Sequence, residues 1–85
     1  LIHSFDIKDG QASADLEWTF PLRHAEVIWG DGARVMRKRL TLPDTTEFGR
    51  QRFTWPVELT GARWYRLEAW DVAGDGAFTQ PKWTP

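Results

Sequence analysis

The sequence has no cysteine, no long apolar run and no excess of basic residues. Without cysteine the chain has neither disulfides nor thiolate metal ligands, so side-chain packing must stabilise the fold. No apolar run approaches the ~20 residues of a membrane-spanning helix, so we expect no membrane partner. Eleven basic and 12 acidic residues give a net charge of -1. This balance argues against a nucleic-acid partner, because such proteins collect phosphates with a positive field.

Aromatic residues are abundant instead: the 85 residues include six Trp, five Phe and one Tyr. Large rings bury much area per residue, which suits a small core, and this length corresponds to one domain. The first residue is Leu1 rather than methionine. We therefore interpret residues 1–85 as a single domain cut from the C-terminus of a larger protein. Its compartment stays open, since the bacterial cytoplasm and secretion both agree with the composition.

Apolar and polar residues alternate along residues 12–20, 52–59 and 64–71. Alternation with a period of two predicts strands that have one face in water. Weaker strand patterns cover residues 2–8, 24–29, 33–42 and 76–83. Seven short strands separated by turn residues predict an all-β fold, a seven-stranded antiparallel β-sandwich of the immunoglobulin or fibronectin type III-like kind.

The apolar side of each strongly alternating strand defines the predicted core. A tryptophan between the two sheets is common in sandwiches, so a buried Trp here needs no functional role. The predicted core residues are Leu16, Trp18, Phe20, Phe53, Trp55, Tyr65 and Leu67.

The tetrapeptide Gly-Asp-Gly-Ala occurs twice, at residues 30–33 and 74–77. Each copy lies between two strand patterns, and Asp-Gly is favoured in tight hairpin turns whose central residues take φ > 0. A calcium loop is the alternative, but it needs about 6–8 oxygen ligands, and each loop offers one or two carboxylates. We therefore predict two hairpin turns, in which Asp71 accepts backbone N–H bonds. The predicted turn residues are Asp31, Gly32, Asp71, Gly74 and Gly76.

Residues for catalysis or metal binding are sparse. The two histidines, His3 and His24, are far apart in sequence, and neither has a second ligand at the spacing of a metal site. Ser4 and Ser13 have no obvious base beside them, and there is no cysteine nucleophile. We expect no catalytic site, no metal site and no cofactor on this domain, and therefore no enzymatic activity of its own.

Several tryptophans fall on the outward side of the predicted strands. Trp64 and Trp70 lie there with Arg66 between them, while Trp29 and Trp83 are ambiguous because their strands alternate poorly. Two tryptophans on one outer face form a patch that suits a partner domain or a sugar ring. The alternative without a function is a ladder in which Arg66 stacks between the aromatic rings. The predicted docking surface consists of Trp64, Arg66, Trp70, Trp29 and Trp83.

The basic residues within 34–40 admit two interpretations. They could meet an anionic partner. We favour an exposed edge strand, because Lys and Arg on an edge discourage aggregation through sheet extension, and the overall charge is balanced.

The C-terminal part of the sequence resembles a known family. Residues 64–83 read WYRLEAWDVAGDGAFTQPKW, and they resemble the last strands of the C-terminal β-sandwich domain of bacterial metal-dependent hydrolases of the PHP (polymerase and histidinol phosphatase) superfamily, in the carbaryl-hydrolase-like branch. Residues 25–35 resemble a hairpin of that domain, and residues 53–59 resemble a further strand. DLEWTFP, at residues 15–21, resembles the second strand of a fibronectin type III module. The matching positions are Arg66, Glu68, Asp71, Gly74, Ala77, Pro81 and Trp83.

The resemblance implies that catalysis belongs to a different domain of a larger protein. In such hydrolases the catalytic metals are held by a separate α/β domain with clusters of His and Asp, and none of those ligands has a counterpart here. The resemblance therefore implies a non-catalytic accessory domain whose partner is the catalytic domain of the same chain. A carbohydrate-binding module that uses exposed tryptophans is the alternative.

Overall fold

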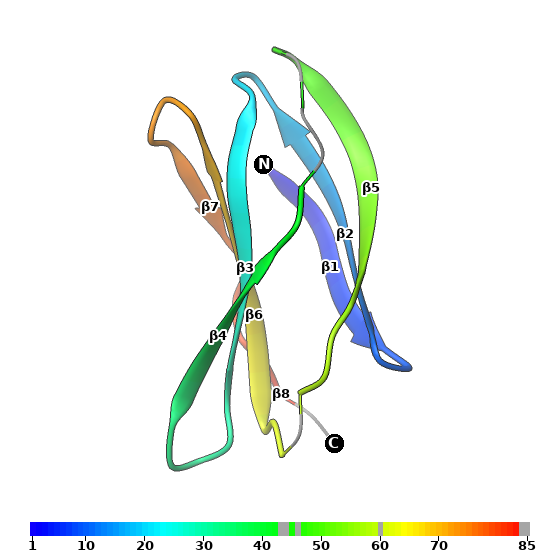
Figure 1. Ribbon diagram of the computed structural model, residues 1–85, viewed down its shortest axis with the longest axis vertical. Helices are drawn as coiled ribbons and strands as arrows, with labels where there is room; N and C mark the ends of the chain where they lie inside the picture. The colour runs from blue at the N-terminus through cyan, green and yellow to red at the C-terminus, as the bar shows by residue number, and fades with distance from the viewer. Residues whose placement is uncertain (43–44, 46, 60, 84–85) are drawn as a thin grey trace.

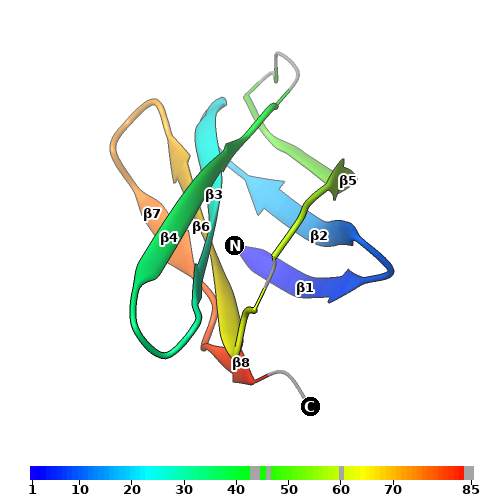
Figure 2. The same ribbon diagram turned by 60° about the horizontal axis from the view of Figure 1, so that its bottom comes forward.

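The computed structural model describes residues 1–42, 45, 47–59 and 61–83. These residues form two antiparallel sheets that face each other (Figures 1 and 2). They include no helix that is long and apolar enough to span a membrane. The strands are β1 (Ile2–Lys8), β2 (Gln11–Trp18), β3 (Leu22–Gly30), β4 (Val35–Leu40), β5 (Gly49–Pro56), β6 (Trp64–Asp71), β7 (Gly76–Phe78) and β8 (Lys82–Trp83).

The first sheet has the order β1-β2-β5, and the second has the order β4-β3-β6-β7, with β8 also paired to β6. The described residues thus contain eight strands rather than the predicted seven. The expected last strand, residues 76–83, is interrupted where Pro81 cannot donate a backbone hydrogen bond. Thr79 still holds the intervening chain to β6, because its backbone N–H and its side-chain oxygen both bond to Leu67.

The core lies between the two sheets, where alternate residues of each strand point inward. Leu16 of β2, Val27 of β3 and Leu67 of β6 are fully buried. Phe53 and Trp55 of β5 stack with ring centroids 5.7 Å apart and complete the wall opposite β6. Of the predicted core residues, the structure buries Leu16, Phe53, Trp55, Tyr65 and Leu67, and packs a partly buried Trp18 against them.

Phe20 is a correction to the predicted core, because it is 45% exposed. The alternation continues to Phe20 in the sequence, but β2 ends at Trp18 and the chain bends at residues 19 and 20. Beyond the bend the strand no longer sets the direction of each side chain. Phe20 therefore lies at the end of the sandwich and outside the core.

Three side chains tie segments that are far apart in sequence. The Tyr65 hydroxyl of β6 donates to Asp6 Oδ1 of β1 at 2.9 Å, and Lys82 Nζ of β8 donates to the Phe5 carbonyl at 2.6 Å. These two bonds join the sheets along one side. The Trp55 indole N–H donates to the Thr41 carbonyl at 2.6 Å and fixes the chain that leaves β4.

The two Gly-Asp-Gly-Ala copies fold differently. In the first, Gly32 takes φ of 97°, and Asp31 Oδ1 accepts the N–H groups of Ala33 and Arg34. Asp31 itself keeps a negative φ, so the prediction of two positive φ values in this turn is wrong.

In the second copy the turn begins before the tetrapeptide, directly after Asp71. Asp71 Oδ1 accepts the N–H groups of Ala73 and Asp75, and Gly74 takes φ of 89°. Gly76, predicted as a turn residue, is instead the first residue of β7 and pairs with Trp70. Because Gly76 has no side chain, the Trp70 indole can pack closely over its backbone.

Candidate functional site: the outer face of the second sheet

The second sheet has one face against the core and one face in solvent. The cross-strand register fixes which residues share the solvent side, because directly paired residues point the same way. We call this side the outer face. Its main residues are Glu26, Ile28, Val35, Arg37, Arg39, Trp64, Arg66, Glu68, Trp70, Phe78 and Trp83.

The middle of the outer face is unusually well covered for a solvent-facing surface. Ile28 has no exposed area, although it lies on the side of the sheet away from the core cluster. It pairs with Arg37 on β4 and with Arg66 on β6, so the long side chains of both neighbours flank it. Glu68 is also buried, with 9% exposure. Apolar stems of arginine commonly cover apolar surface in this way while the charged group stays in water.

Ion pairs connect the charged residues across three strands. Arg66 Nη1 lies 2.9 Å from Glu68 Oε1 on the same strand, and Arg37 Nη1 lies 3.4 Å from Glu68 Oε2. Arg37 and Arg39 lie 3.2 and 3.3 Å from the two carboxylate oxygens of Glu26. The result is a continuous ladder of alternating charge from β4 to β6. Arg66 therefore has a carboxylate partner on its own strand.

The electrostatics of Glu26 reflect this ladder. Desolvation is the strongest single influence and raises the pKa of Glu26, but the hydrogen bonds and the positive charges of Arg37 and Arg39 together outweigh it. The pKa of Glu26 consequently lies below its usual value. The carboxylate is ionised at neutral pH, and the charge ladder is intact there.

Aromatic residues flank the charge ladder at both ends of β6. Trp64 pairs with Gly30 and Trp70 pairs with Gly76. A Cβ added at either glycine would collide with the indole, and at Gly76 the nearest ring atoms of Trp70 would be only 2.7 Å away. Each indole thus lies down over the backbone of its glycine partner, as aromatic residues do across from strand glycines. The two indole rings therefore lie flat on the outer face of the sheet.

Two highly exposed aromatic residues lie beside these flat indoles. Trp83 of β8 pairs with Trp64 and is 73% exposed. Phe78 of β7 makes an edge-to-face contact with Trp70, with centroids 5.5 Å apart, and is 55% exposed. Exposed apolar residues that gather on one face around a polar centre are typical of interaction surfaces.

The structure brings together four of the five predicted docking residues. Trp64, Arg66, Trp70 and Trp83 share the outer face. Trp29 is a correction, because it pairs with Tyr65 and so points to the inner side, where it packs against the core partly buried. Its indole N–H is buried and has no hydrogen-bond partner among the residues that the structure describes.

Sequence reasoning missed part of the outer face. Ile28 and Phe78 were not predicted there, nor were the carboxylate of Glu26 and the guanidinium groups of Arg37 and Arg39 as its partners. The useful signal for the face was a glycine paired with Trp64 and another with Trp70, but this signal appears only once the strand register is known.

No three His, Asp or Glu side chains among the described residues are close enough to hold a metal ion together. Comparison with known proteins found no family model that matches the chain, and no curated protein or solved structure matches it either.

Proposed function

We propose that this chain is a non-catalytic accessory domain that docks on a neighbouring domain through the outer face. One observation carries the proposal: the outer face already holds a buried Ile28 and a fixed charge ladder, and exposed aromatic residues flank both. Contact surfaces that bind strongly combine aromatic and arginine anchors with a preorganised surround. The outer face has both kinds of anchor.

We also propose that the fold is of the fibronectin type III kind. The strand order supports this assignment, because β4 pairs with β3 in the second sheet and does not extend the sheet of β1, β2 and β5. In the constant immunoglobulin arrangement the fourth strand lies in the first sheet. On this view β7 and β8 are two halves of one last strand, which returns the total to seven.

The partner we propose is the catalytic domain of the same chain, in a bacterial protein that resembles PHP-type metal-dependent hydrolases. The resemblance of residues 64–83 supports this choice. Among the residues that carry the resemblance, Asp71 and Gly74 form the last turn, and Arg66, Glu68 and Trp83 belong to the outer face. The likeness therefore extends over both the hairpin and the docking surface.

A binding measurement with the two domains expressed separately tests the proposal. The coding sequence upstream of Leu1 supplies the partner, which we expect to be an α/β domain rich in His and Asp. Trp83→Ser should weaken association by about 30-fold or more, because the truncation of an anchor residue commonly costs ≥ ~2 kcal/mol. Isothermal titration calorimetry measures this loss directly.

Val72→Ser is the matched control. Val72 is also an exposed apolar residue, but it lies in the turn between β6 and β7 and not on a strand of the outer face. Its substitution should leave the affinity within about twofold, as expected for residues outside a contact. Equal affinities for both variants and the parent domain would refute docking through the outer face, and so would an upstream sequence without a catalytic domain.

A carbohydrate-binding module is the second candidate, and the flat indoles of Trp64 and Trp70 favour it. A ring that lies on the sheet exposes a π-face, which is the geometry that stacks on a sugar ring. Affinity electrophoresis in gels that contain soluble polysaccharides tests this function. Retarded migration that Trp70→Ala abolishes would support it, and unchanged migration across the glycan panel would exclude it.

A further inference from the structure

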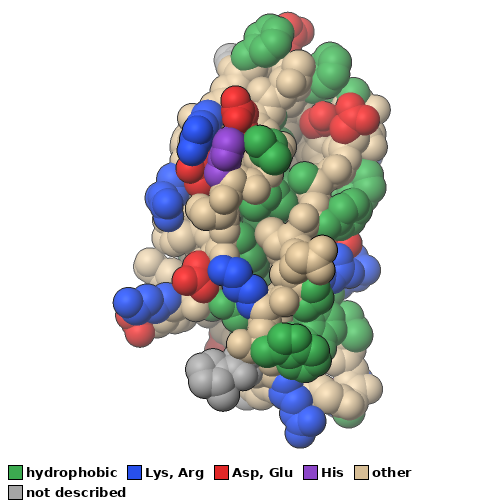
Figure 3. Space-filling model, turned by 180° about the vertical axis from the view of Figure 1, so that it is seen from behind, with side chains coloured by type: hydrophobic (Ala, Val, Ile, Leu, Met, Phe, Trp, Pro, Cys, Tyr) green, Lys and Arg blue, Asp and Glu red, His purple; other side chains and the backbone are tan. Residues whose placement is uncertain are grey.

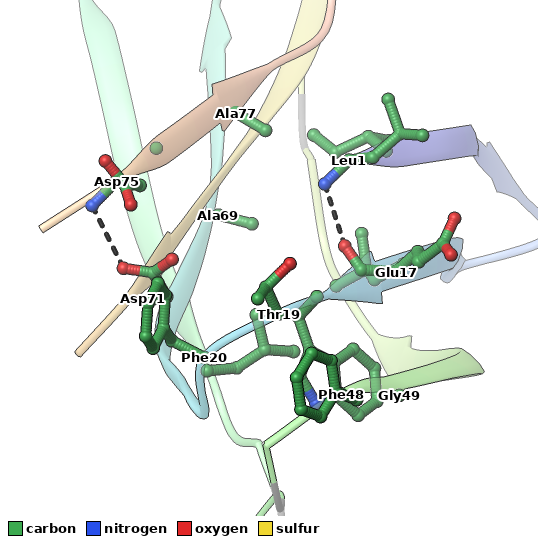
Figure 4. A pocket seen from close by; sticks show the side chains of 15 residues that line it. Leu1, Glu17, Thr19, Phe20, Phe48, Gly49, Ala69, Asp71, Asp75 and Ala77 are labelled. Carbon is green, nitrogen blue, oxygen red and sulfur yellow. Dashed lines mark hydrogen bonds between the residues drawn. The ribbon is translucent and has the colours of Figure 1, made fainter. Parts of the chain in front are cut away.

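The two sheets separate at one end and leave a cleft of about 670 Å³ between them. Figure 4 shows this cleft, with Leu1 and Glu17 on one side and Ala69, Ala77 and the Asp71 turn on the other. The side chains that line it come from both sheets. The cleft is therefore distinct from the outer face, which lies on the opposite side of β6.

A row of small residues explains why the space is open. Ala69 of β6 and Ala77 of β7 pair directly across the second sheet, so both point inward at the same level, and both line the cleft. Their single methyl groups do not reach far toward Leu16 on the facing sheet. At this level of the core the two sheets cannot fill the gap, and the cleft opens at the side where β1 and β7 are edge strands.

The cleft has an apolar interior and an acidic mouth. Ile2, Leu16 and Leu22 line the interior, and the exposed rings of Phe20 and Phe48 stand at the entrance. Two carboxylates, those of Asp71 and Asp75, lie at the entrance on the side away from Phe48 (Figure 4). No lysine or arginine is among the described residues that line the cleft, and the α-ammonium group of Leu1, which also lines it, donates to the Glu17 carbonyl at 2.8 Å.

The cleft continues into a second groove. That groove has a volume of about 680 Å³, shares Ile2 with the first, and runs between β1 and residues 78–82. It is more polar, with His3, Asp6 and Lys82 along its sides. Figure 3 shows the corresponding face, where hydrophobic side chains run down the middle and charged groups lie to either side. A long groove with an apolar pocket at one end suits an extended chain better than a compact ligand.

We propose that this cleft binds an extended peptide segment of a partner protein, in which an aromatic or aliphatic anchor residue is followed by lysine or arginine. The anchor fills the space above Ala69 and Ala77. The cation that follows it lies at the mouth with Asp71 and Asp75. Charge complementarity selects this occupant, because an acidic segment would meet two carboxylates without a compensating lysine or arginine at the entrance.

Three matched peptides test the proposal by NMR titration of the ¹⁵N-labelled domain. The probes are acetyl-Gly-Phe-Lys-Gly-amide, its Phe-Glu counterpart and its Ala-Lys counterpart. The Phe-Lys peptide should shift the backbone amides of Ala69 and Ala77 and the indole signal of Trp18 saturably. The Phe-Glu peptide should bind about 2- to 30-fold more weakly, as expected for two exposed ion pairs. The Ala-Lys peptide should lose about 10-fold or more, because the anchor no longer buries its ring.

Variants of the domain separate the cleft from the outer face. Ala77→Leu, which places a larger side chain in the cleft, and Phe48→Ser, which removes a ring from the entrance, should each weaken the Phe-Lys peptide at least about fivefold. Asp75→Asn should reduce the preference for Lys over Glu while it leaves the Asp71 turn in place. Trp83→Ser, on the outer face, should bind the peptide normally. Thermal unfolding verifies that each variant is folded.

Three results would overturn the proposal: equal affinity for the Phe-Lys and Phe-Glu peptides, shifts confined to Trp64 and Trp70, or unchanged binding by folded Ala77→Leu. Equal affinity for the two peptides and unchanged binding by Ala77→Leu leave docking through the outer face untested, whereas shifts confined to Trp64 and Trp70 would place the peptide on the outer face instead. The two proposals therefore succeed or fail separately.

Discussion

The Tyr65–Asp6 hydrogen bond joins the two sheets, and Tyr65→Phe removes it with almost no change in shape. Tyr65 is buried in the core, and its hydroxyl donates to a carboxylate oxygen at 2.9 Å. Hydrogen bonds to charged groups contribute about 1.5–3 kcal/mol. The Asp6 side chain is 67% exposed, so water competes for it. We therefore expect Tyr65→Phe to lower the free energy of unfolding by about 1 kcal/mol.

The size of the domain makes this loss measurable. For a domain of this length, 1 kcal/mol corresponds to a fall of roughly 4–8 °C in the unfolding midpoint. Circular dichroism melts of the two proteins give the difference. Asp6→Ala in both backgrounds completes a double-mutant cycle, whose coupling energy should be close to the loss from Tyr65→Phe alone.

The pH dependence gives an independent test. Donation by the Tyr65 hydroxyl, followed by donation from the Ile7 N–H, holds the pKa of Asp6 below its usual value. As the pH falls, the Asp6 carboxylate is therefore protonated at a higher pH in the unfolded chain than in the folded chain. The stabilisation from Asp6 is complete above about pH 4 and disappears as the pH falls through the folded-state pKa. The difference between wild type and Tyr65→Phe should shrink in the same interval.

At alkaline pH the dependence of stability on pH has the opposite direction, and it comes from Tyr65 itself. Burial, and then the bond to Asp6, raises the pKa of Tyr65 above its usual value. Its contribution is present below about pH 10 and is lost as the pH rises through the folded-state pKa, so the wild type alone should weaken there. Equal midpoints at neutral pH, or a difference that stays constant down to about pH 2, would refute the role assigned to this bond.

Three further substitutions test other parts of the structure. Ile28→Ala should cost about 2–5 kcal/mol in guanidinium unfolding although Ile28 lies outside the core, and a loss below about 1 kcal/mol would contradict its burial on the outer face. Asp71→Ala should cost about 1 kcal/mol, because two turn N–H groups lose their acceptor, and faster amide exchange in residues 72–75 should accompany it. Gly76→Ala should cost about 1–3 kcal/mol through its collision with Trp70, and in a Trp70→Leu background the cost should mostly vanish.

The sequence predicts the all-β class and most strand positions because the alternation is strong where one sheet face is buried. Residues 64–71 were predicted as a strand, and β6 has these bounds, since Tyr65, Leu67 and Ala69 alternate cleanly with outward residues. The prediction fails at strand ends. Periodicity carries no information about where the backbone bends, so Phe20 follows the pattern of β2 without belonging to the strand.

The outer face was only partly predictable, and β3 shows why. Val27, Ile28 and Trp29 are three successive apolar residues, so alternation cannot say which of them point inward. The register with β6 decides: Val27 and Trp29 pair with inward residues, and Ile28 pairs with Arg66. Burial of Ile28 then depends on long side chains from two neighbouring strands. Such cover is a property of the assembled sheet and leaves no local pattern in the sequence.

The repeated tetrapeptide shows how similar local chemistry is placed differently in the two hairpins. Asp31 and Asp71 have the same task, since each carboxylate accepts two N–H groups of the following turn. Asp31 belongs to its copy of the repeat, whereas Asp71 precedes the other copy, so aligning the copies misaligns the turns.

What the two hairpins share in space is an aspartate that closes the turn and a strand glycine beneath an outer-face tryptophan. Gly30 comes before its turn and Gly76 after its turn. Each glycine both ends a hairpin loop and lies beneath a flat indole. A substitution at either glycine should therefore disturb the docking surface and the hairpin together, while a substitution at Asp31 or Asp71 should disturb the hairpin first.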